Sequence, residues 1–342
     1  MSSVIPRVSV ILPVRDAEKT LGMAIESILG QTESNLELLV VNDRSRDTSP
    51  GILTEFARLD RRIRLFSTVN PGIVEALNLG LAEARSPYLA RMDADDVSLP
   101  ERLCLQCDYL DANPEVGLVS CRVEHWNEDA EVRAGYEAYV GWTNQVLNDA
   151  ELRLRRFVES PFAHPSVVYR KSVVERFGGY REGSFPEDYE LWLRWFEHGV
   201  RMGKLGEILL RWRDHDNRLS RIDTRYSVEA FYKMKLEYLH RWLKDNNCHF
   251  PKVKIWGAGR ITRNRAKSLL KAGTVVSGFY DIDPRKVGNP RTGLRVQSIE
   301  DIPDPGEEFI VAMVGARGAR DKVVAFLRDR GHREGTDFVL AA

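Results

Sequence analysis

The first hundred residues alternate between apolar runs of strand length and segments in which apolar residues recur at helical spacing. In one such segment Ala76, Leu77, Gly80, Leu81 and Ala84 repeat every three or four positions, which is the spacing of one helix face. Alternation of this kind is typical of a mostly parallel sheet with helices on both faces, so an α/β fold is predicted. The expected strands are 8–14, 36–41, 63–66 and 88–92, and the expected helices end at residues 30, 59 and 84.

The pattern is less regular between residues 116 and 169, where strands are expected at 117–123 and 166–169 and a polar, tryptophan-containing stretch at 126–142. Two segments of the form Ser-x-x-Glu, beginning at Ser98 and Ser184, predict capping boxes at helix starts. The second helix carries the apolar stripe Leu191, Trp192, Trp195 and Phe196.

A long amphipathic helix is expected at 225–244, and Asn246, Asn247 and Pro251 then interrupt the chain. From residue 253 the order restarts as strand, glycine turn and helix to 272, followed by strands within 275–284 and 309–314. The 342 residues exceed what one hydrophobic core usually serves. We therefore predict a first domain over 1–222, a helical linker over 223–250 and a small Rossmann-like α/β domain over 251–342.

Composition narrows the classes of protein that the chain can belong to. Apolar residues make up 43% and charged residues 29%, and Lys plus Arg equals Asp plus Glu at 50 each, so no overall field favours nucleic acid or an anionic membrane. No apolar stretch approaches the roughly 20 residues that span a bilayer. The four cysteines lack the spacing of a zinc site, and buried free thiols are expected.

Aspartates follow three of the expected strands. Asp16 comes two residues after the first strand, Asp43 directly after the second, and Asp93, Asp95 and Asp96 lie in the segment MDADD after the fourth. In an open parallel sheet, ligands bind at the carboxyl ends of the strands. Carboxylates packed at that edge repel one another unless a cation lies between them, and oxygen ligands suit Mg²⁺ or Mn²⁺.

The alternative for any one of these aspartates is a turn or cap, because Asp readily bonds the backbone amides that follow it. Capping can use one acid of the MDADD segment and leaves the other two unexplained. The segment therefore predicts a site for a divalent cation that would bridge the diphosphate of a nucleotide.

Five segments in order resemble glycosyltransferase family 2, whose nucleotide-binding fold is called GT-A. They are VSVILPVRDAEKTLGMAIESILGQT, LELLVVNDRSRDTS, NPGIVEALNLGLAEARSPYLARMDADD, HPSVVYRKSVVERFGGY and FPEDYELWLRW, which lie between residues 8 and 195, and the resemblance as a whole covers residues 8–215. The resemblance implies that Asp43 contacts the donor base and that Asp95 or Asp96, with His215, holds the metal. It implies a donor site made of Pro13, Val14, Asp16, Asp43, Asn70, Asp93, Ala94 and Asp95.

Removal of a proton from an acceptor hydroxyl requires a base, and Glu187 and Asp188 are adjacent candidates. Glu187 is three residues after Ser184, so closing a capping box explains it equally well. Asp188 extends the apolar stripe of its helix at the N-terminus, which directs it inward. In similar enzymes an acid of this pair is the base, and direct displacement on the donor carbon then inverts the anomeric configuration.

His164 opens the segment HPSVVYR, and His215 lies in RWRDHDNRLS, where relatives often carry a histidine near the diphosphate. For His215, a metal or phosphate contact and an ordinary loop position are equally compatible with the sequence. The neighbouring guanidinium groups match phosphate oxygens in geometry, although a solvated face also explains them. These arginines are Arg211, Arg213, Arg218 and Arg221.

Gly257 and Gly259 form a turn between a strand and a helix, which suits a phosphate near the helix N-terminus. The third glycine of a dinucleotide fingerprint is replaced by Thr262, and Asp281 ends the second strand where a ribose-binding acid would lie. The segment resembles nucleotide-fold domains attached to sugar-modifying enzymes. A structural or oligomerising module that has lost its ligand is the alternative.

The resemblance implies a metal-dependent, inverting enzyme that moves a sugar from a nucleotide-diphosphate donor to a hydroxyl of a carbohydrate or lipid-linked acceptor, in polysaccharide or glycolipid assembly. The acceptor is expected near 126–142. A nucleotidyltransferase is one alternative, but it should carry a glycine-rich, lysine-containing loop where this chain has Leu12-Pro13-Val14-Arg15-Asp16. A non-catalytic nucleotide-sugar sensor that acts through the C-terminal domain is the other. A cytoplasmic location is predicted, and peripheral attachment at the inner face of the membrane and oligomer formation are left open.

Overall fold

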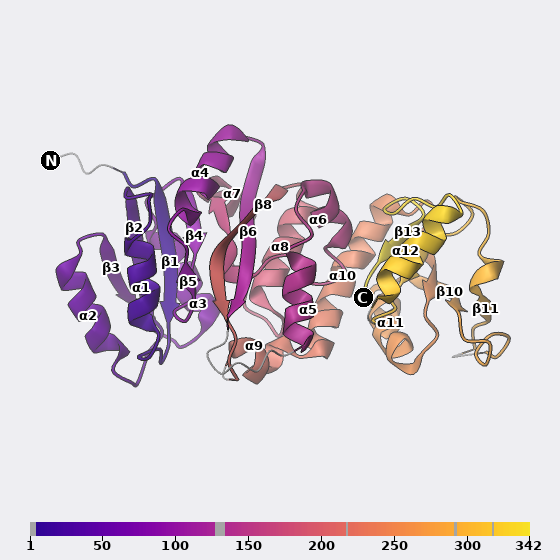
Figure 1. Cartoon of the computed structure of the whole chain (residues 1–342). Coiled ribbons are helices and arrows are strands. Elements are labelled where there is room, and N and C mark those ends of the chain that lie inside the picture. The colour runs from indigo at the N-terminus through magenta and orange to yellow at the C-terminus, as the bar shows by residue number, and fades with distance from the viewer. Residues whose placement is uncertain (1–4, 127–133, 217, 291–292, 317) are drawn as a thin grey trace. The chain divides into compact units, whose positions relative to one another are not determined.

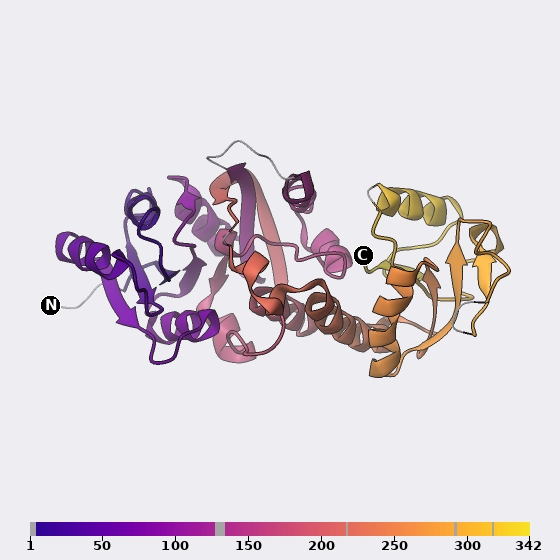
Figure 2. The same ribbon diagram turned by 90° about the horizontal axis from the view of Figure 1, so that it is seen from below.

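The computed structural model describes all residues except 1–4, 127–133, 217, 291–292 and 317. The chain divides into two compact units. The first comprises 1–152, 161–183 and 187–222, and the second comprises 153–160, 184–186 and 223–342. Figures 1 and 2 show a sheet with helices in each. The long helix α10 (Val228–Asn246) falls in the second unit, and the bounds proposed above for a separate linker stay a prediction.

In the first unit the described residues form an eight-stranded sheet in the order β3-β2-β1-β4-β7-β6-β8-β5. Strands β1 to β4 pair in parallel, and β7 is antiparallel to both of its neighbours. The strands are β1 (Val8–Val14), β2 (Leu36–Asn42), β3 (Ile63–Ser67), β4 (Tyr88–Arg91), β5 (Val97–Ser98), β6 (Val116–Trp126), β7 (Val168–Arg170) and β8 (Arg201–Arg213). The α/β fold predicted from the alternation of apolar segments is confirmed.

Helices cover both faces of this sheet. One apolar core joins the sheet to α1, α2 and α4, and a second joins it to α3, α7 and α8. The helices of this unit are α1 (Leu21–Leu29), α2 (Ser49–Leu59), α3 (Ile73–Glu83), α4 (Arg102–Ala112), α5 (Ala134–Thr143), α7 (Lys171–Phe177), α8 (Glu187–Glu197) and α9 (Leu219–Ile222), while α6 (Asp149–Arg155) extends from this unit into residues of the second.

Strand β1 is buried along its whole length because it lies between these two cores. Val10 and Leu12 face the core under α1, whereas Ile11 faces α3. The approach of α3 is so close that a Cβ on Gly80 would lie 2.5 Å from Ile11 Cγ2. Glycine at this position therefore permits the contact between helix and strand.

Neither predicted capping box starts its helix. Helix α4 begins at Arg102, and its side-chain cap comes from Gln31, whose Oε1 accepts the backbone N–H of Leu103 at 3.0 Å. Ser98 Oγ instead accepts the Gln31 amide at 3.1 Å. Helix α8 begins at Glu187, so Ser184 does not directly precede its first turn. At α4, a side chain from a distant part of the sequence thus caps the helix in place of the predicted Ser98.

The prediction of buried cysteines needs one correction. All four thiols are free, but two of them, Cys107 and Cys121, are buried, while Cys104 is half-buried and Cys248 is exposed. Of the predicted acceptor stretch 126–142, residues 127–133 lie outside the described residues.

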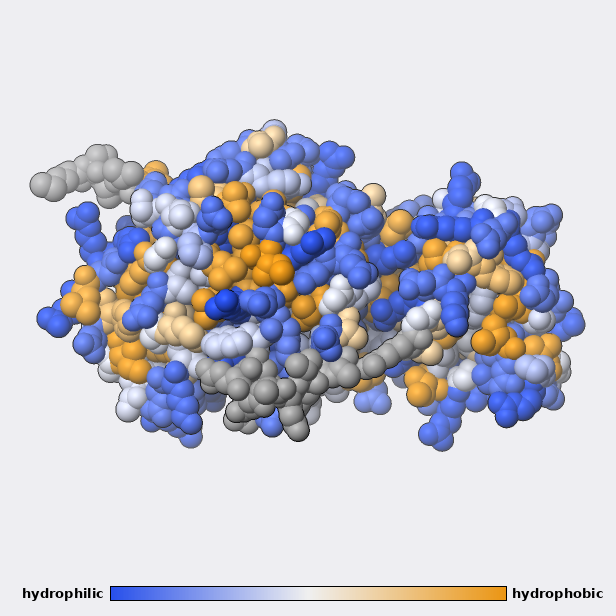
Figure 3. Space-filling view, viewed as in Figure 1, coloured by the Kyte–Doolittle hydropathy of each residue, from blue (hydrophilic) through white to orange (hydrophobic). Residues whose placement is uncertain are grey.

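No helix in the described chain is long and apolar enough to cross a bilayer. Figure 3 shows one face on which hydrophilic side chains alternate with hydrophobic areas.

The second unit contains a parallel sheet in the order β11-β10-β9-β12-β13 among the described residues. The order reverses between β9 and β12, so this pair forms the switch point of the sheet. The strands are β9 (Lys252–Trp256), β10 (Val275–Asp281), β11 (Val296–Ser298), β12 (Ile310–Ala312) and β13 (Phe338–Leu340), and the helices besides α10 are α11 (Arg260–Ala272) and α12 (Ala319–Asp329).

Candidate active site

The carboxyl ends of β2, β1 and β4 meet at one edge of the first sheet, because β1 pairs in parallel with both neighbours. The end of β8 reaches the same place, since the backbone N–H of Arg213 donates to Asp96 Oδ1 at 2.8 Å. The loop after β4 and the segment after β8 are therefore held together. This edge is where an open α/β sheet binds ligands.

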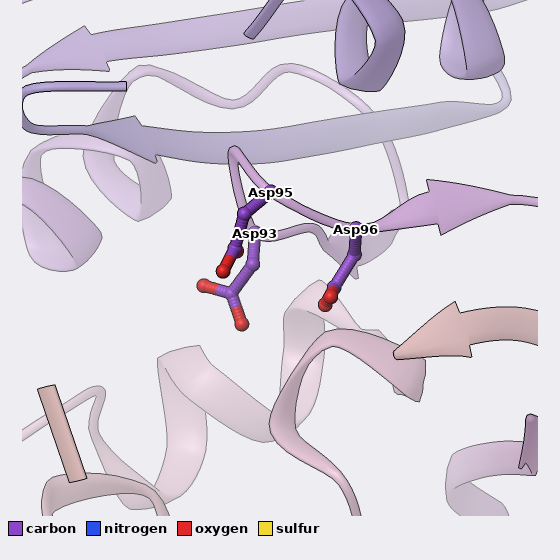
Figure 4. Close-up of side chains that lie close together, drawn as sticks. All are labelled: Asp93, Asp95 and Asp96. Atoms are coloured by element: carbon purple, nitrogen blue, oxygen red, sulfur yellow. The ribbon is translucent and has the colours of Figure 1, made fainter. Parts of the chain in front are cut away.

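Three carboxylates gather on the loop after β4 (Figure 4). Asp93, Asp95 and Asp96 each offer one oxygen atom, and these oxygens lie within 4.8 Å of one another. Asp96 Oδ2 is buried and has no hydrogen-bond partner among the described residues. A buried oxygen without a donor costs free energy, and a cation would satisfy it. The all-oxygen donor set fits Mg²⁺ or Mn²⁺.

The three carboxylates have different electrostatic surroundings. Burial, reinforced by the neighbouring Asp95 and Asp93, raises the pKa of Asp96 well above its usual range. Burial also acts to raise the pKa of Asp95, but the hydrogen bond from His215 and the charge of Arg218 outweigh it and lower that pKa. His215 Nε2 lies 2.8 Å from Asp95 Oδ2. The structure thus brings His215 to the acidic cluster, although its role as a ligand stays a prediction.

Asp43 lies directly after β2 and is almost completely buried. Its Oδ1 accepts the Thr68 hydroxyl and the Gly72 backbone N–H, both at 2.9 Å. Arg15 lies 3.5 Å from Oδ2. These contacts fix the carboxylate beside the loop that leads into α3, at the same sheet edge as the acidic cluster.

The other residues proposed for the donor site lie around the same edge. Asp16 is exposed, has a left-handed φ of 49° and accepts the Arg46 backbone N–H at 2.7 Å, so it holds two loops together. The Ala94 carbonyl accepts the Thr20 hydroxyl at 2.9 Å. Asn70 is exposed in the loop before α3. Pro13 and Val14 are buried at the end of β1.

Arg91, the last residue of β4, is a buried cation that the sequence analysis did not select. Its guanidinium donates to Asp93 Oδ1 at 2.6 Å, and the charges of Asp93 and Glu187 raise its pKa against the effect of burial. An arginine inside an otherwise apolar strand, directly before an acidic segment, was the available signal. Arg91 therefore places a positive charge between the acidic cluster and helix α8.

Helix α8 carries both proposed bases in its first turn. Glu187 is buried and Asp188 is half-buried. Desolvation and the neighbouring Glu187 raise the pKa of Asp188 to about 7, while the charge of Arg91 acts in the opposite direction. A carboxyl group with this pKa exchanges its proton near neutral pH, as a general base must. The catalytic assignment of either acid stays a prediction.

His164 is part of a buried group beside this helix. Its Nε2 lies 2.8 Å from the Tyr180 hydroxyl, and its ring meets Trp192 edge-on with centroids 5.9 Å apart. Burial and the charge of Arg91 lower the pKa of His164 well below its usual range. His164 is therefore a neutral, packed imidazole near the same arginine.

The arginines at the end of β8 and in the segment after it have specific partners. Arg218 stacks on Trp212, with its guanidinium carbon 4.4 Å from the ring centroid, and donates to the Arg213 carbonyl at 2.9 Å. Arg221 pairs with the buried Asp214. Arg211 is exposed and pairs with Glu124 at 2.9 Å. Of these, Arg218 lies close enough to the acidic cluster to influence the pKa of Asp95 and Asp96.

The glycine turn of the second unit follows β9. Gly257 has a left-handed φ of 115°, and Gly259 precedes the first turn of α11. Asp281 Oδ2 accepts the Ala258 backbone N–H at 2.8 Å, and Lys286 lies 3.0 Å from the same oxygen. The carboxylate proposed as a ribose contact thus already supports the turn, and a nucleotide at Gly257, Gly259 and Asp281 stays a prediction.

Comparison with known proteins places this site in a family. The model of the family described as Glycosyl transferase family 2 matches residues 9–178. An uncharacterized glycosyltransferase of Haemophilus influenzae is 30% identical over 243 residues, which cover 70% of this chain and 75% of that protein. The O-antigen biosynthesis glycosyltransferase WbnJ of Escherichia coli is 29% identical over 246 residues, which cover 70% of this chain and 91% of that protein.

A similar solved structure is that of S. aureus TarS 1-349 in complex with UDP-GlcNAc, with a TM-score of 0.52 and 16% identity. The alignment covers 69% of this chain and 66% of that one. At this identity the likeness concerns the fold, which agrees with the GT-A architecture that the resemblance implied. The family match and the relatives named above show that the chain is a glycosyltransferase of family 2.

Proposed function

We propose that the first unit transfers a sugar from a nucleotide-diphosphate donor to an acceptor hydroxyl, with a divalent cation at Asp93, Asp95 and Asp96 and with inversion at the donor carbon. The observation that carries the proposal is that Arg91 interacts with two acidic features, the Asp93–Asp96 cluster suited to a cation and Asp188, an acid suited to proton transfer. The names of the relatives support assembly of a cell-surface polysaccharide as the setting. A carbohydrate or lipid-linked acceptor is proposed with it.

The donor side of the mechanism is electrostatic. A bound Mg²⁺ or Mn²⁺ would neutralise negative charge on the diphosphate as it leaves. Arg218 is held near the acidic cluster by Trp212 and the Arg213 carbonyl. Its guanidinium would add a second positive charge whose planar shape suits phosphate oxygens. Asp43, fixed after β2, would contact the base of the nucleotide.

The acceptor side requires a proton to be removed. Asp188 would accept the proton of the acceptor hydroxyl while that oxygen forms a bond to the anomeric carbon. The bond from that carbon to the diphosphate oxygen breaks at the same time, and the leaving oxygen keeps the electron pair. Attack from the side opposite the leaving group inverts the configuration. Arg91 keeps Asp188 partly ionised near neutral pH, because its charge opposes the increase in pKa that burial causes.

The test is a panel of nucleotide sugars assayed for nucleoside diphosphate release with Mn²⁺, with Mg²⁺ and with EDTA. Wild type, Asp95→Ala and Asp188→Asn are compared, and Glu55→Gln is the matched control because Glu55 is an exposed carboxylate on α2. We expect release from one donor that requires metal and both aspartates and that is unchanged in Glu55→Gln. The anomeric configuration of the product, read by NMR, tests inversion.

Three results would count against the proposal. Normal turnover by a folded Asp188→Asn variant would remove Asp188 as the base. Turnover that persists in EDTA would remove the cation from the mechanism while leaving the family assignment in place. Binding of a donor without any turnover would favour the sensor alternative, whereas the family match already disfavours a nucleotidyltransferase.

A further inference from the structure

The second unit contains a cluster of charged side chains that the glycosyltransferase reaction does not use. Lys235 on α10, Arg265 on α11 and Arg320 on α12 each interact electrostatically with Glu159. Tyr232, one turn before Lys235 on α10, interacts with both arginines and with Glu159. Residues from four separate segments of the sequence thus meet at one place.

Lys235 is the most buried cation of this cluster, and its ammonium group has few hydrogen-bond partners. The residue has no exposed surface. Its Nζ donates to the Val158 carbonyl at 3.0 Å and lies 3.9 Å from the centroid of the Tyr232 ring. An ammonium group has three donors, and the described residues provide one hydrogen-bond acceptor for it. A buried ammonium group with unused donors lowers the stability of the fold unless an anion or ordered water accepts the remaining hydrogen bonds.

One member of the cluster, Arg265, reaches the switch point of the second sheet. The turn after β9 and the turn after β12 are adjacent, because a Cβ on Gly257 would lie 3.4 Å from Val314 Cγ2. A Cβ on the next residue, Gly315, would lie 3.7 Å from a terminal nitrogen of Arg265. Arg265 therefore extends to the crevice position between β9 and β12, where sheets of this type bind ligands.

Positive groups outnumber negative ones in this cluster. Lys235, Arg265 and Arg320 share the carboxylate of Glu159, while Arg320 Nε also donates to the Ala342 main-chain oxygen at 2.7 Å and the nearby Arg155 pairs separately with Glu334. Burial, with a smaller effect of the charges of Arg265 and Arg320, lowers the pKa of Lys235 to about 7 against the opposing charge of Glu159. A ligand with two negative charges would compensate this excess. Two arginines with planar donor groups favour a phosphate group over other dianions.

The glycine turn is compatible with such a ligand. A Cβ on Gly259 would meet no atom within 4 Å, so the backbone before α11 is open. Helix α11 is 13 residues long, and its N-terminus carries a partial positive charge. Asp281 supports the turn from the side of β10 and is not part of the cluster.

We propose that the second unit binds the phosphate or diphosphate group of a small molecule through Lys235, Arg265 and Arg320. This site is independent of the proposed donor site and does not need a divalent cation. The ligand is either a nucleotide, whose base and ribose add further contacts, or a simpler phosphorylated compound.

The experiment is isothermal titration calorimetry of the full chain with inorganic pyrophosphate in EDTA, which removes the cation that the Asp93–Asp96 loop would need. We expect wild type and Asp95→Ala to bind equally. Arg265→Gln should weaken binding by about tenfold or more, as the loss of a charge-assisted contact to phosphate implies. The matched control is Lys267→Gln, which removes a positive charge from an exposed position of the same helix.

Further titrations identify the class of the ligand, and a second variant keeps the test valid if Arg265→Gln does not fold. Tighter binding of a nucleoside diphosphate than of pyrophosphate identifies a nucleotide, whereas equal binding identifies a simpler phosphorylated ligand, and either result supports the site. If Arg265→Gln is poorly folded, Arg265→Lys takes its place in the test. This variant keeps the charge but loses the planar donor group, so its affinity for pyrophosphate should be lower than that of wild type. No pyrophosphate binding to wild type, equal binding by folded Arg265→Gln, or loss of binding in Asp95→Ala would overturn the proposal. A lower melting temperature in Arg265→Gln without weaker binding would show a structural ion cluster instead.

Discussion

The guanidinium of Arg91 and the carboxylate of Asp93 are joined by a 2.6 Å hydrogen bond at the end of strand β4. The arginine is buried, and its charge also reaches Asp188 on helix α8. One buried cation therefore interacts both with the acidic cluster and with the proposed base. Both halves of the proposed reaction depend on it electrostatically.

Removing this cation should change how activity depends on pH. In Arg91→Gln the pKa of Asp188 should rise further, because Arg91 is one of the groups that lower it. A base acts when it is deprotonated, so the acidic limb of kcat/KM against pH should move to higher pH, and the rate at pH 7 should fall by about fivefold for a rise of about one pKa unit. The control is Arg201→Gln, an exposed arginine paired with Glu115 at 3.8 Å. An unchanged pH profile in Arg91→Gln would contradict this account.

Asp188 should also make the stability of the fold depend on pH. Its pKa is raised from an ordinary value of 3.8 to about 7 in the folded chain, so the folded state binds the proton more tightly than the unfolded state. Its contribution to stability is therefore fully present below pH 3.8 and is lost as the pH rises through about 7. Asp188→Asn cannot ionise and should lose less stability than wild type between these values. Urea unfolding at several pH values measures this difference, and parallel pH curves for the two proteins would refute it.

His215 should strengthen metal binding through Asp95, to which it lies at 2.8 Å. Groups that orient a metal-binding carboxylate typically change metal affinity by about 10 to 100-fold when they are removed. His215→Ala should therefore require about tenfold more Mn²⁺ or Mg²⁺ for half-maximal turnover. The exposed His198, which stacks on Phe177, provides the control variant His198→Ala. Equal metal requirements for His215→Ala and wild type would exclude this role.

The contact between α3 and β1 predicts a stability difference between two glycines. Gly80→Ala would place a Cβ 2.5 Å from Ile11 Cγ2 in the core, so a loss of about 1–3 kcal/mol is expected. Gly51→Ala adds a Cβ on α2 that meets nothing within 4 Å, and it should stabilise the protein by roughly 0.5–1 kcal/mol because alanine favours a helix. Thermal or chemical unfolding of both variants tests the contrast. A neutral Gly80→Ala substitution would show that the strand can move away from the helix.

The parts of the fold that the sequence predicted well are those with a strong local signal. Strands β1 and β2 are apolar runs buried on both faces, and they were expected at 8–14 and 36–41. Strand β8 was not predicted, although it is 13 residues long, because its exposed positions interrupt the apolar pattern. The register of β8 beside β6 depends on pairing between distant segments, which no local window contains.

In the candidate site, too, residues with a local sequence signal were predicted and residues defined by distant neighbours were not. The aspartates after β2 and β4 could be selected because they follow buried strands, and the structure brings Asp93, Asp95 and Asp96 together as expected. Arg91 was missed because its importance comes from neighbours on α8 that are about a hundred positions away in sequence. The cluster around Lys235 was missed for the same reason, since its four segments meet only after folding.

The Gln31 cap has a consequence for how α4 opens. The amide N–H of Leu103 is held by the side chain of Gln31, 72 positions earlier in the chain and just after the end of α1, so fraying of the first turn of α4 also breaks a tertiary contact. Exchange of that hydrogen with solvent requires this contact to open. The Leu103 amide is therefore an intrinsic reporter of the opening of this part of the protein, and its exchange rate would follow the free energy of that opening.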